Sequence, residues 1–287
     1  MAKRRRDVSI VIPSYNRCGT VVRAVRDCLS LDPGPREVVV VDDHSDSDPT
    51  NELVSLDPAV VRVIRLASNI GQAGARSVAF AHAAGQLIVS LDDDSRFIDL
   101  DALDRVWRRF ELSERCGVLA FATFAPAVPV RPPLDRVTKV ADHITCGAAY
   151  RASVLRETGY HTEWLRYMGE ESEISIKTID AGFDVLHDES IRVFHDYDPT
   201  GRSPGAVRRS RRFAVRNDMV VCWLHFPLEL AVPLSLWRAL SNVMFGLRRQ
   251  MLVPTILGIV SAVGASRRAL VARRPVRRWA ARRAWWT

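Results

Sequence analysis

Short apolar runs alternate with longer amphipathic stretches in the first third of the chain, and this alternation limits its fold more than any other feature. Helical spacing of apolar residues occupies 20–31 and 71–84. The apolar runs, five to seven residues long, lie at 8–12, 37–41, 60–66 and 87–91. Such Val- and Ile-rich runs are typical of strands buried on both faces. We therefore predict an α/β fold with a doubly wound, mostly parallel sheet.

The pattern continues with more variation after residue 100. Amphipathic spacing or a glycine stop predicts helices at 101–114, 152–158 and 169–181. Further strands are expected at 118–124, 144–150 and 191–195. The proline-rich segment 126–133 lies between the strands expected at 118–124 and 144–150. Two-domain chains often divide at such points.

Three of the expected strands end in polar clusters: Pro13-Ser14-Tyr15-Asn16, Asp42-Asp43 and Asp92-Asp93-Asp94. Ligands of doubly wound sheets bind beyond the carboxyl ends of the strands. A single acidic strand end is commonly a helix cap or a turn. Neighbouring carboxylates repel one another, however, and a hard divalent cation with phosphate ligands would relieve that repulsion. Three such ends predict a crevice for a cation and a nucleotide.

Four residues from other segments are candidates for the same crevice. Arg76, near the start of the Ala-rich helix, could meet a phosphate or lie on the surface. Glu170 and Glu171 open a helix, where acidic residues interact well with the helix dipole. Residues at i and i+1 do not share a face, so one glutamate should face the crevice, where it could act as a general base. His195 ends a strand and could be an imidazole ligand.

Seven segments in order resemble glycosyltransferase family 2, which has the GT-A fold, and the resemblance covers roughly residues 7–225. The segments are 8–16, 40–43, 69–76, 91–94, 147–151, 169–171 and 193–195. The resemblance implies transfer of a sugar from a nucleotide-sugar donor to a hydroxyl acceptor, with inversion at the anomeric carbon. It also implies a divalent cation, Mn²⁺ or Mg²⁺. The acceptor would belong to a cell-surface polysaccharide, a glycolipid or a natural product.

The resemblance also implies roles for single residues. Asp92 and Asp94 match the family's Asp-x-Asp motif, with Asp94 as the direct metal ligand, and His195 matches the histidine that completes the metal site. Glu171 stands where the family has its catalytic base, usually Asp, and Glu170 and Glu173 remain alternatives. The donor would be held by Pro13, Tyr15, Asn16, Asp42, Asp43, Arg76, Asp92 and Asp93.

These assignments imply a GT-A catalytic domain over 1–225, with a nucleotide-binding half at 7–125 and an acceptor half at 126–225. A helical C-terminal extension would occupy 226–287. Residues 199–287 hold 17 arginines and only two acids, although the whole chain has a formal net charge of +8. This asymmetry suggests an anionic partner for the C-terminal part.

Three features of the C-terminal part suggest a membrane surface. The arginines of 208–216 could be a solvated face, bind phosphate or touch lipid headgroups. The apolar stretch 251–265 is shorter than the roughly 20 residues that span a bilayer. The tail 273–286 interleaves Arg pairs with Trp279, Trp285 and Trp286, as interfacial helices do. We predict peripheral attachment to an anionic cytoplasmic membrane, with a packing or oligomerisation face as the alternative.

Other classes fit less well. The five scattered cysteines indicate reduced thiols in a cytosolic protein, and the basic start of the chain is not followed by a signal-peptide core. A nucleotidyltransferase would need a glycine-rich, basic loop after the first strand, which Ser14-Tyr15-Asn16 does not supply. A nucleic-acid-binding protein is suggested only by the Arg-rich tail, so we expect no nucleic-acid partner.

Overall fold

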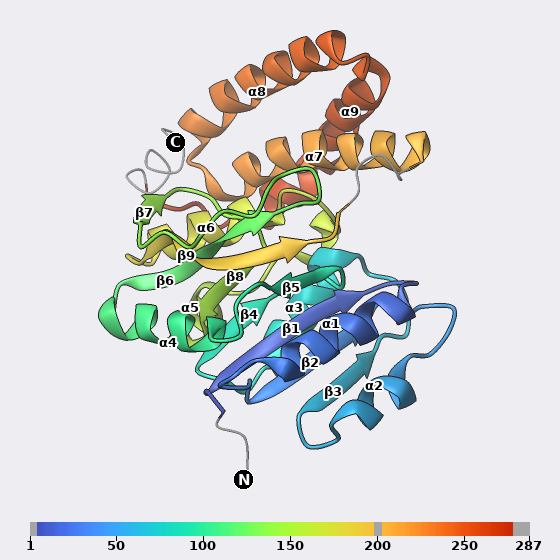
Figure 1. Ribbon diagram of the computed structural model, residues 1–287. Helices are drawn as coiled ribbons and strands as arrows, with labels where there is room; N and C mark the ends of the chain where they lie inside the picture. Colours follow the sequence, from blue (N-terminus) through green and yellow to red (C-terminus); the bar gives the residue numbers. More distant parts are fainter. Residues whose placement is uncertain (1–4, 198–202, 278–287) are drawn as a thin grey trace.

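The structure is a computed structural model that describes residues 5–197 and 203–277, and a single mixed sheet runs through it (Figure 1). The sheet order is β3-β2-β1-β4-β8-β6-β9-β5, and β7 also pairs with β9. The strands are β1 (Val8–Ser14), β2 (Glu37–Asp42), β3 (Val61–Arg65), β4 (Leu87–Ser90), β5 (Ser95–Phe97), β6 (Cys116–Phe124), β7 (Val137–Val140), β8 (Ala148–Arg151) and β9 (Asp184–His195).

Helices cover both faces of this sheet. Every residue of β1, β2 and β4 is buried, as expected for strands without a solvent-facing side. One core lies between the sheet and α1, α2 and α4, and a second lies between the sheet and α3, α5, α6 and α7. The helices are α1 (Cys18–Ser30), α2 (Thr50–Leu56), α3 (Gln72–His82), α4 (Ala102–Leu112), α5 (Ala152–Thr158), α6 (Glu170–Asp180), α7 (Pro204–His225), α8 (Leu228–Arg248) and α9 (Leu252–Val271).

The predicted parallel part is confirmed, and the second half of the sheet is mixed. Strands β3, β2, β1 and β4 are parallel neighbours. Strand β8 is antiparallel to both β4 and β6, whereas β6 and β9 are parallel. The short strand β5, which the sequence did not predict, pairs antiparallel with the end of β9 and places Ser95 opposite His195. This pairing carries His195 to the acidic end of β4.

Two expected strands have different limits in the structure. The strand expected at 144–150 begins only at Ala148, because Gly147 has a positive φ of 93° and Ile144 is 58% exposed. The strand expected at 191–195 is the last part of the longer β9. The proline-rich segment 126–133 does not interrupt the sheet, since β6 before it and β7 after it both pair with β9.

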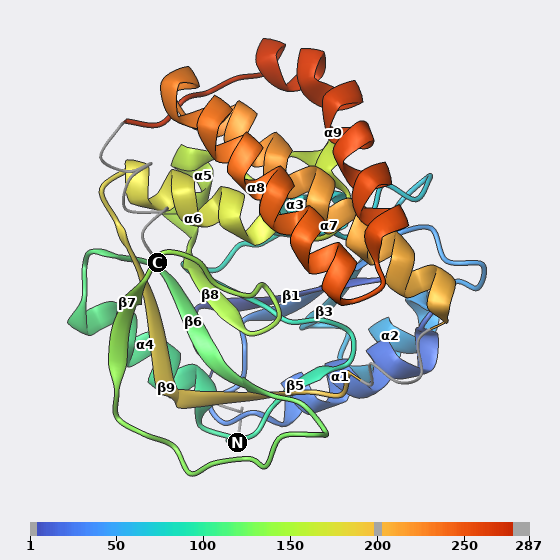
Figure 2. The same ribbon diagram turned by 90° about the horizontal axis from the view of Figure 1, so that it is seen from above.

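Helices α7, α8 and α9 pack together as a helical layer beside α6 (Figure 2). Helix α9 has 20 residues, more than the 251–265 stretch expected, because Pro254 lies in its first turn, where proline is tolerated. Among the described residues, α8 is the one helix that is long and apolar enough to cross a membrane, and only 22% of its apolar window is buried. The tail tryptophans Trp279, Trp285 and Trp286 lie outside the described residues.

Candidate active site

The carboxyl ends of β1 and β4 bring the acidic triplet into contact with the loop after β1. Ser14 Oγ donates to Asp93 Oδ2 over 2.9 Å. Arg17 Nη1 lies 2.8 Å from both Asp93 Oδ1 and Asp94 Oδ2. Arg17 is not among the site residues predicted from the sequence, although its place directly after Asn16 at a strand end was a usable signal. The triplet is therefore partly neutralised by a cation from the chain itself.

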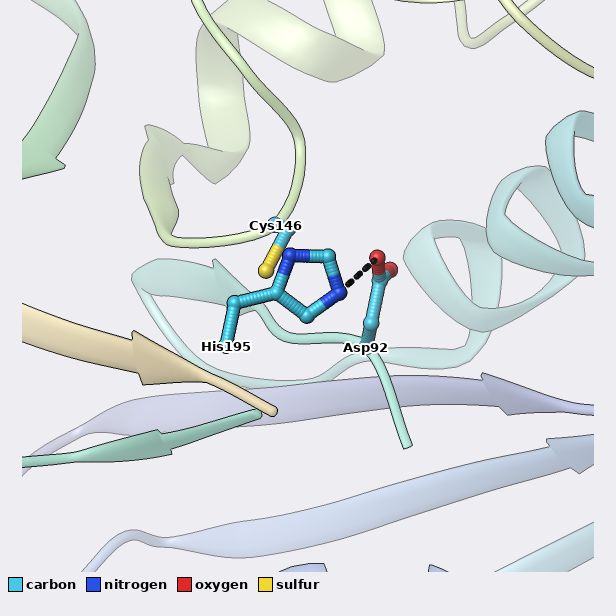
Figure 3. Close-up of side chains that lie close together, drawn as sticks. All are labelled: Asp92, Cys146 and His195. Carbon is cyan, nitrogen blue, oxygen red and sulfur yellow. Dashed lines mark ion pairs between the residues drawn. The ribbon is translucent and has the colours of Figure 1, made fainter. Parts of the chain in front are cut away.

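His195 and Cys146 complete a cluster of possible metal ligands around the triplet (Figure 3). His195 Nε2 lies 3.0 Å from Asp94 Oδ1 and 3.8 Å from Asp92 Oδ2. Ligand atoms of Asp92, Cys146 and His195 all lie within 4.8 Å of one another. Cys146 stands just before β8, and its Sγ lies 2.8 Å from Ser95 Oγ. No motif marked Cys146, because its partners come from distant segments.

This donor set fits a divalent cation. Carboxylate oxygens and an imidazole are ligands that Mn²⁺ accepts, and Mg²⁺ prefers the oxygens. Asp94 Oδ1 is buried and lies 3.0 Å from His195 Nε2, so both atoms could serve one cation. Burial raises the pKa of the Cys146 thiol well above its ordinary value. Cys146 therefore adds a neutral thiol to the cluster.

The pKa values of Asp93 and Asp94 are shifted in opposite directions. Burial raises the pKa of Asp93 to about 7, against the opposing effect of Arg17. Burial also acts to raise the pKa of Asp94, but His195 and Arg17 outweigh it and hold that pKa to about 2. Asp94 thus stays ionised, while Asp93 is held by Ser14 and Arg17.

Arg76 is fully buried and joins the acidic triplet to the start of α6. Its Nη2 donates to Asp92, its Nε donates to Ser90 Oγ over 2.9 Å, and its Nη1 lies 3.5 Å from Glu170 Oε1. Burial acts to lower the pKa of Arg76, but the charges of Asp92 and Glu170 raise it above its ordinary value. The surface position that the sequence left open is therefore excluded.

The three candidate glutamates of α6 have different surroundings. Glu170 is 2% exposed and faces Arg76. Glu173 is 1% exposed and accepts hydrogen bonds from the backbone N–H of Thr162 (2.7 Å) and from its Oγ1 (2.6 Å). Glu171 is half-buried, and no other described residue forms a hydrogen bond or an ion pair with its side chain. Burial and the charge of Glu170 raise the pKa of Glu171 to about 8.

The carboxylates after β2 are engaged by the protein itself. Asp42 is fully buried and accepts hydrogen bonds from Ser45 and, over 2.9 Å, from Arg65 Nη1. Asp43 accepts from the backbone N–H groups of Ile70 (2.7 Å) and Gly71 (2.9 Å). These contacts tie β2 to β3 and to the start of α3, so both aspartates shape the expected donor crevice.

The residues after β1 take three different positions. Pro13 is buried within β1, next to Val41 of β2. Tyr15 is 47% exposed and presents a ring that a base could contact. Asn16 has a positive φ of 54° and exchanges hydrogen bonds with Asp46. The donor roles of all three stay predictions.

Comparison with known proteins relates the first part of the chain to one family. Residues 9–131 match the model of Glycosyl transferase family 2. The succinoglycan biosynthesis protein ExoO of Rhizobium meliloti is 39% identical over 112 residues, which cover 39% of this chain and 31% of that protein. The UDP-Glc:alpha-D-GlcNAc-diphosphoundecaprenol beta-1,3-glucosyltransferase WfgD of Escherichia coli is 30% identical over 91 residues, 32% of this chain and 36% of its own length. The chain thus spans about a third of the length of these relatives.

Solved structures share the whole architecture. The Staphylococcus aureus protein TarS 1–349 in complex with UDP-GlcNAc superposes with a TM-score of 0.62 at 18% identity, covering 92% of this chain and 81% of that one. The mannosyltransferase PcManGT from Pyrobaculum calidifontis, with GDP-Man and Mn²⁺, gives 0.62 at 15% identity and covers 100% and 90%. The chain therefore has the GT-A fold, with additional C-terminal helices.

Proposed function

Because residues 9–131 match the model of Glycosyl transferase family 2, we propose that the chain is an inverting, cation-dependent glycosyltransferase of this family that uses a nucleotide-diphosphate-sugar donor. One observation carries the proposal: the buried Arg76 contacts both Asp92 of the acidic triplet and Glu170, the neighbour of Glu171 in the first turn of α6. Inverting transfer needs one group that stabilises the leaving diphosphate and a second group, the base, that takes the proton of the acceptor hydroxyl.

The donor side would be organised by the acidic triplet. Asp94, Asp92 and His195 would hold Mn²⁺ or Mg²⁺, and the bound cation would offset the negative charge that develops on the departing nucleoside diphosphate. Arg76 contributes a fixed positive charge behind Asp92. Arg17 holds Asp93 and Asp94 in place before the donor arrives. The neighbouring structures with Mn²⁺ and nucleotide sugars support this arrangement.

The acceptor side would be served by Glu171. Its carboxylate takes the proton of the acceptor hydroxyl as that oxygen bonds to the anomeric carbon on the face opposite the diphosphate. The bond to the diphosphate breaks in the same step, so the configuration inverts without a covalent intermediate. Glu171 suits this role better than Glu170 or Glu173, because those two carboxylates are committed to Arg76 and Thr162. Its raised pKa makes it a stronger base once ionised.

The acceptor and the location are part of the same proposal. ExoO is a succinoglycan biosynthesis protein and WfgD acts on a diphosphoundecaprenol-linked sugar, which supports an acceptor in cell-surface polysaccharide synthesis. The exposed apolar residues of α8, among them Trp237 (59%) and Leu240 (61%), support peripheral attachment at the cytoplasmic face of a membrane. In this proposal 1–225 is the catalytic domain and 226–287 the attaching extension. Neither a nucleotidyltransferase nor a nucleic-acid-binding protein gains support from the relatives.

Thermal unfolding of the full chain with Mn²⁺ and a panel of uridine and guanosine diphosphates and their sugars tests the proposal. We expect one nucleotide to stabilise the wild type in the presence of Mn²⁺, by about 2.7 kcal/mol at a concentration of about 100 Kd. Asp94→Asn should lose this gain, and Asp27→Asn, an exposed change on α1, should keep it. The proposal fails if no nucleotide stabilises the wild type, or if Asp94→Asn responds like Asp27→Asn.

A further inference from the structure

A groove of about 680 Å³ lies between α7, α9 and the segment around Trp164. Its residues are of two kinds. Arginines line one side, and the other side is apolar, with Val253, Pro254 and Leu257 of α9. The arginines are Arg166, Arg208, Arg209, Arg212 and Arg216.

The positive charge of this groove is not balanced by acids. Arg208, Arg212 and Arg216 follow one another at intervals of four and so share one face of α7. Arg212 donates to Ser261 Oγ (3.0 and 2.8 Å), and Arg216 donates to the Trp164 carbonyl oxygen and to Asn217 Oδ1. In the described part of the chain, none of the three forms an ion pair with a carboxylate. Burial and the charges of Arg268 and Arg212 lower the pKa of Arg216. An anion in the groove would relieve this crowding.

The apolar side of the groove continues onto the free surface of α9. Val253 is 71% exposed and Leu257 is 46% exposed. Ile256 and Val260, one turn apart on the same helix, are also exposed. A purely solvated arginine face would need no apolar wall. Nucleic acid has no hydrocarbon chain that would cover such a wall. A ligand that matches both sides is an amphiphile with an anionic head.

The groove is connected to the candidate active site through the segment between Trp164 and Gly169. Arg166 donates to Asn69 Oδ1 over 2.9 Å, and its carbonyl oxygen accepts from Ala73 at the start of α3. Asn217, next to Arg216, donates to the carbonyl oxygens of Leu165, Tyr167 and Met168. This segment runs directly into α6, which carries Glu171. The groove and the acceptor side of the candidate site are therefore joined by one segment of chain.

We propose that the groove binds the diphosphate of a lipid-linked sugar acceptor, with its hydrocarbon chain along α9. A diphosphate is favoured over the single phosphodiester of a bilayer lipid because it has the charge and the oxygens to engage several arginines at once. The proposal rests on the proposed glycosyltransferase function and gives the chemical class of its acceptor. It assigns Arg208, Arg212 and Arg216 to headgroup recognition rather than to general attraction by the membrane.

Vesicle binding by the full chain tests the proposal. One set of phosphatidylcholine vesicles contains a few per cent of a polyprenyl diphosphate, and a second set contains phosphatidylglycerol at equal charge. We expect the wild type to bind the first set at least tenfold more tightly. Arg208→Gln with Arg212→Gln should reduce that affinity roughly tenfold or more, because each lost charged hydrogen bond weakens binding. The matched control, Arg248→Gln with Arg267→Gln, removes the same charge from exposed positions outside the groove and should change the affinity less than about twofold.

The other possible results of these experiments also test the proposal. Equal binding of both vesicle sets, or equal losses in the two double variants, would mean general attraction to anionic membranes and would overturn the proposal. Soluble farnesyl diphosphate should bind at least tenfold more tightly than inorganic pyrophosphate, since only the former covers the apolar wall, and equal affinities would also contradict it. Thermal stabilisation by Mn²⁺ and nucleotide separates the two claims. If the nucleotide response is intact and the groove variant still binds polyprenyl diphosphate like the wild type, this inference alone fails.

Discussion

At the residue scale, the three aspartates after β4 show how neighbours in sequence acquire different tasks. Asp92 faces Arg76, Asp93 faces Ser14, and Asp94 faces His195. Asp93 and Asp94 lie in a turn after β4, so the three side chains point in different directions and each meets a different element. The sequence already separated Asp92 and Asp94 from Asp93 through the Asp-x-Asp resemblance. The partners Arg17 and Cys146 could not be predicted, because each reaches the triplet through the fold.

Glu171→Gln should reduce sugar transfer by about 10²–10⁴-fold, because the amide cannot take the acceptor proton. Donor binding should persist, since the side chain of Glu171 forms no hydrogen bond or ion pair with the acidic triplet in the described structure. Transfer rates and nucleotide-induced thermal shifts measure the two effects separately. Glu157→Gln, an exposed change on α5, serves as the control. A Glu171→Gln enzyme with full activity would remove this residue from the mechanism.

The pH dependence of transfer should reflect the raised pKa of Glu171. A base acts only when ionised, and a pKa near 8 leaves much of it protonated at neutral pH. The rate at saturating substrates should therefore rise between about pH 6 and 9, well above the range of an ordinary glutamate. A rate that is flat over this range, or that rises only near pH 4–5, would contradict the assignment.

At the element scale, α7 and α9 approach so closely that a glycine is needed at the crossing. A Cβ on Gly258 would lie 2.8 Å from the Arg212 carbonyl oxygen and 2.8 Å from Val215 Cβ. On the same helix, a Cβ on Gly264 would meet nothing within 4 Å. The Ala and Gly residues of α9 therefore do more than raise its apolar character, because they set the distance at which the basic groove is formed.

Gly258→Ala should destabilise the protein by about 1–3 kcal/mol, since overpacking exceeds the gain in helix propensity. Gly264→Ala should be neutral or stabilising by up to about 1 kcal/mol, because helix propensity alone changes there. Urea unfolding of both variants provides the comparison. Identical effects of the two substitutions would show that α7 and α9 are not in tight contact.

Glu173 joins α6 to α7 and should make stability depend on acid pH. Burial acts to raise its pKa, but Lys177, His225 and Thr162 outweigh burial and lower it below the ordinary 4.5. A depressed pKa adds stability above pH 4.5 that is lost as the pH falls through the folded value. Glu173→Gln should lower the free energy of unfolding by about 3 kcal/mol at pH 7. It should also weaken the fall of that free energy between pH 5 and pH 3. Urea midpoints at pH 7, 5, 4 and 3 give the curves, and parallel curves for variant and wild type would refute this account.

At the scale of the whole molecule, the helical layer combines a basic groove with a largely exposed apolar helix. Almost all acids of the chain lie before residue 199, whereas residues 199–287 hold 17 arginines and only two acids. The molecule therefore has an acidic cluster at one end of its sheet and a basic, apolar layer beside it. This polarity suits an enzyme that takes a soluble donor on one side and a membrane-bound acceptor on the other.

Charges on the exposed face of α8 should release the protein from membranes. Trp237→Asp with Leu240→Asp removes two exposed apolar contacts, each able to contribute roughly tenfold to binding. Recovery with phosphatidylcholine–phosphatidylglycerol vesicles in a flotation assay should fall strongly, while the thermal unfolding midpoint stays within about 2 °C. Leu112→Asp, at the 79% exposed end of α4, should leave recovery unchanged. Equal recovery of all three proteins would contradict peripheral attachment through α8.

The sequence by itself determined the sheet, its polar strand ends and the family. These features follow from local patterns in the sequence: the spacing of apolar residues, the proline and glycine residues that end helices and strands, and the polar residues next to them. The predicted GT-A fold is confirmed, and residues 9–131 match the model of the predicted family. The roles of the single site residues stay predictions, because they depend on a donor and an acceptor.

Only the tertiary structure decided which side chains meet. The antiparallel pairing of β5 with β9 joins residues about a hundred positions apart and brings His195 to Asp94. The burial of Arg76 between Asp92 and Glu170 likewise depends on how α3 packs between β4 and α6. Local periodicity records which face of an element is buried. It does not record which other element covers that face, and the chemistry of this protein depends on that choice.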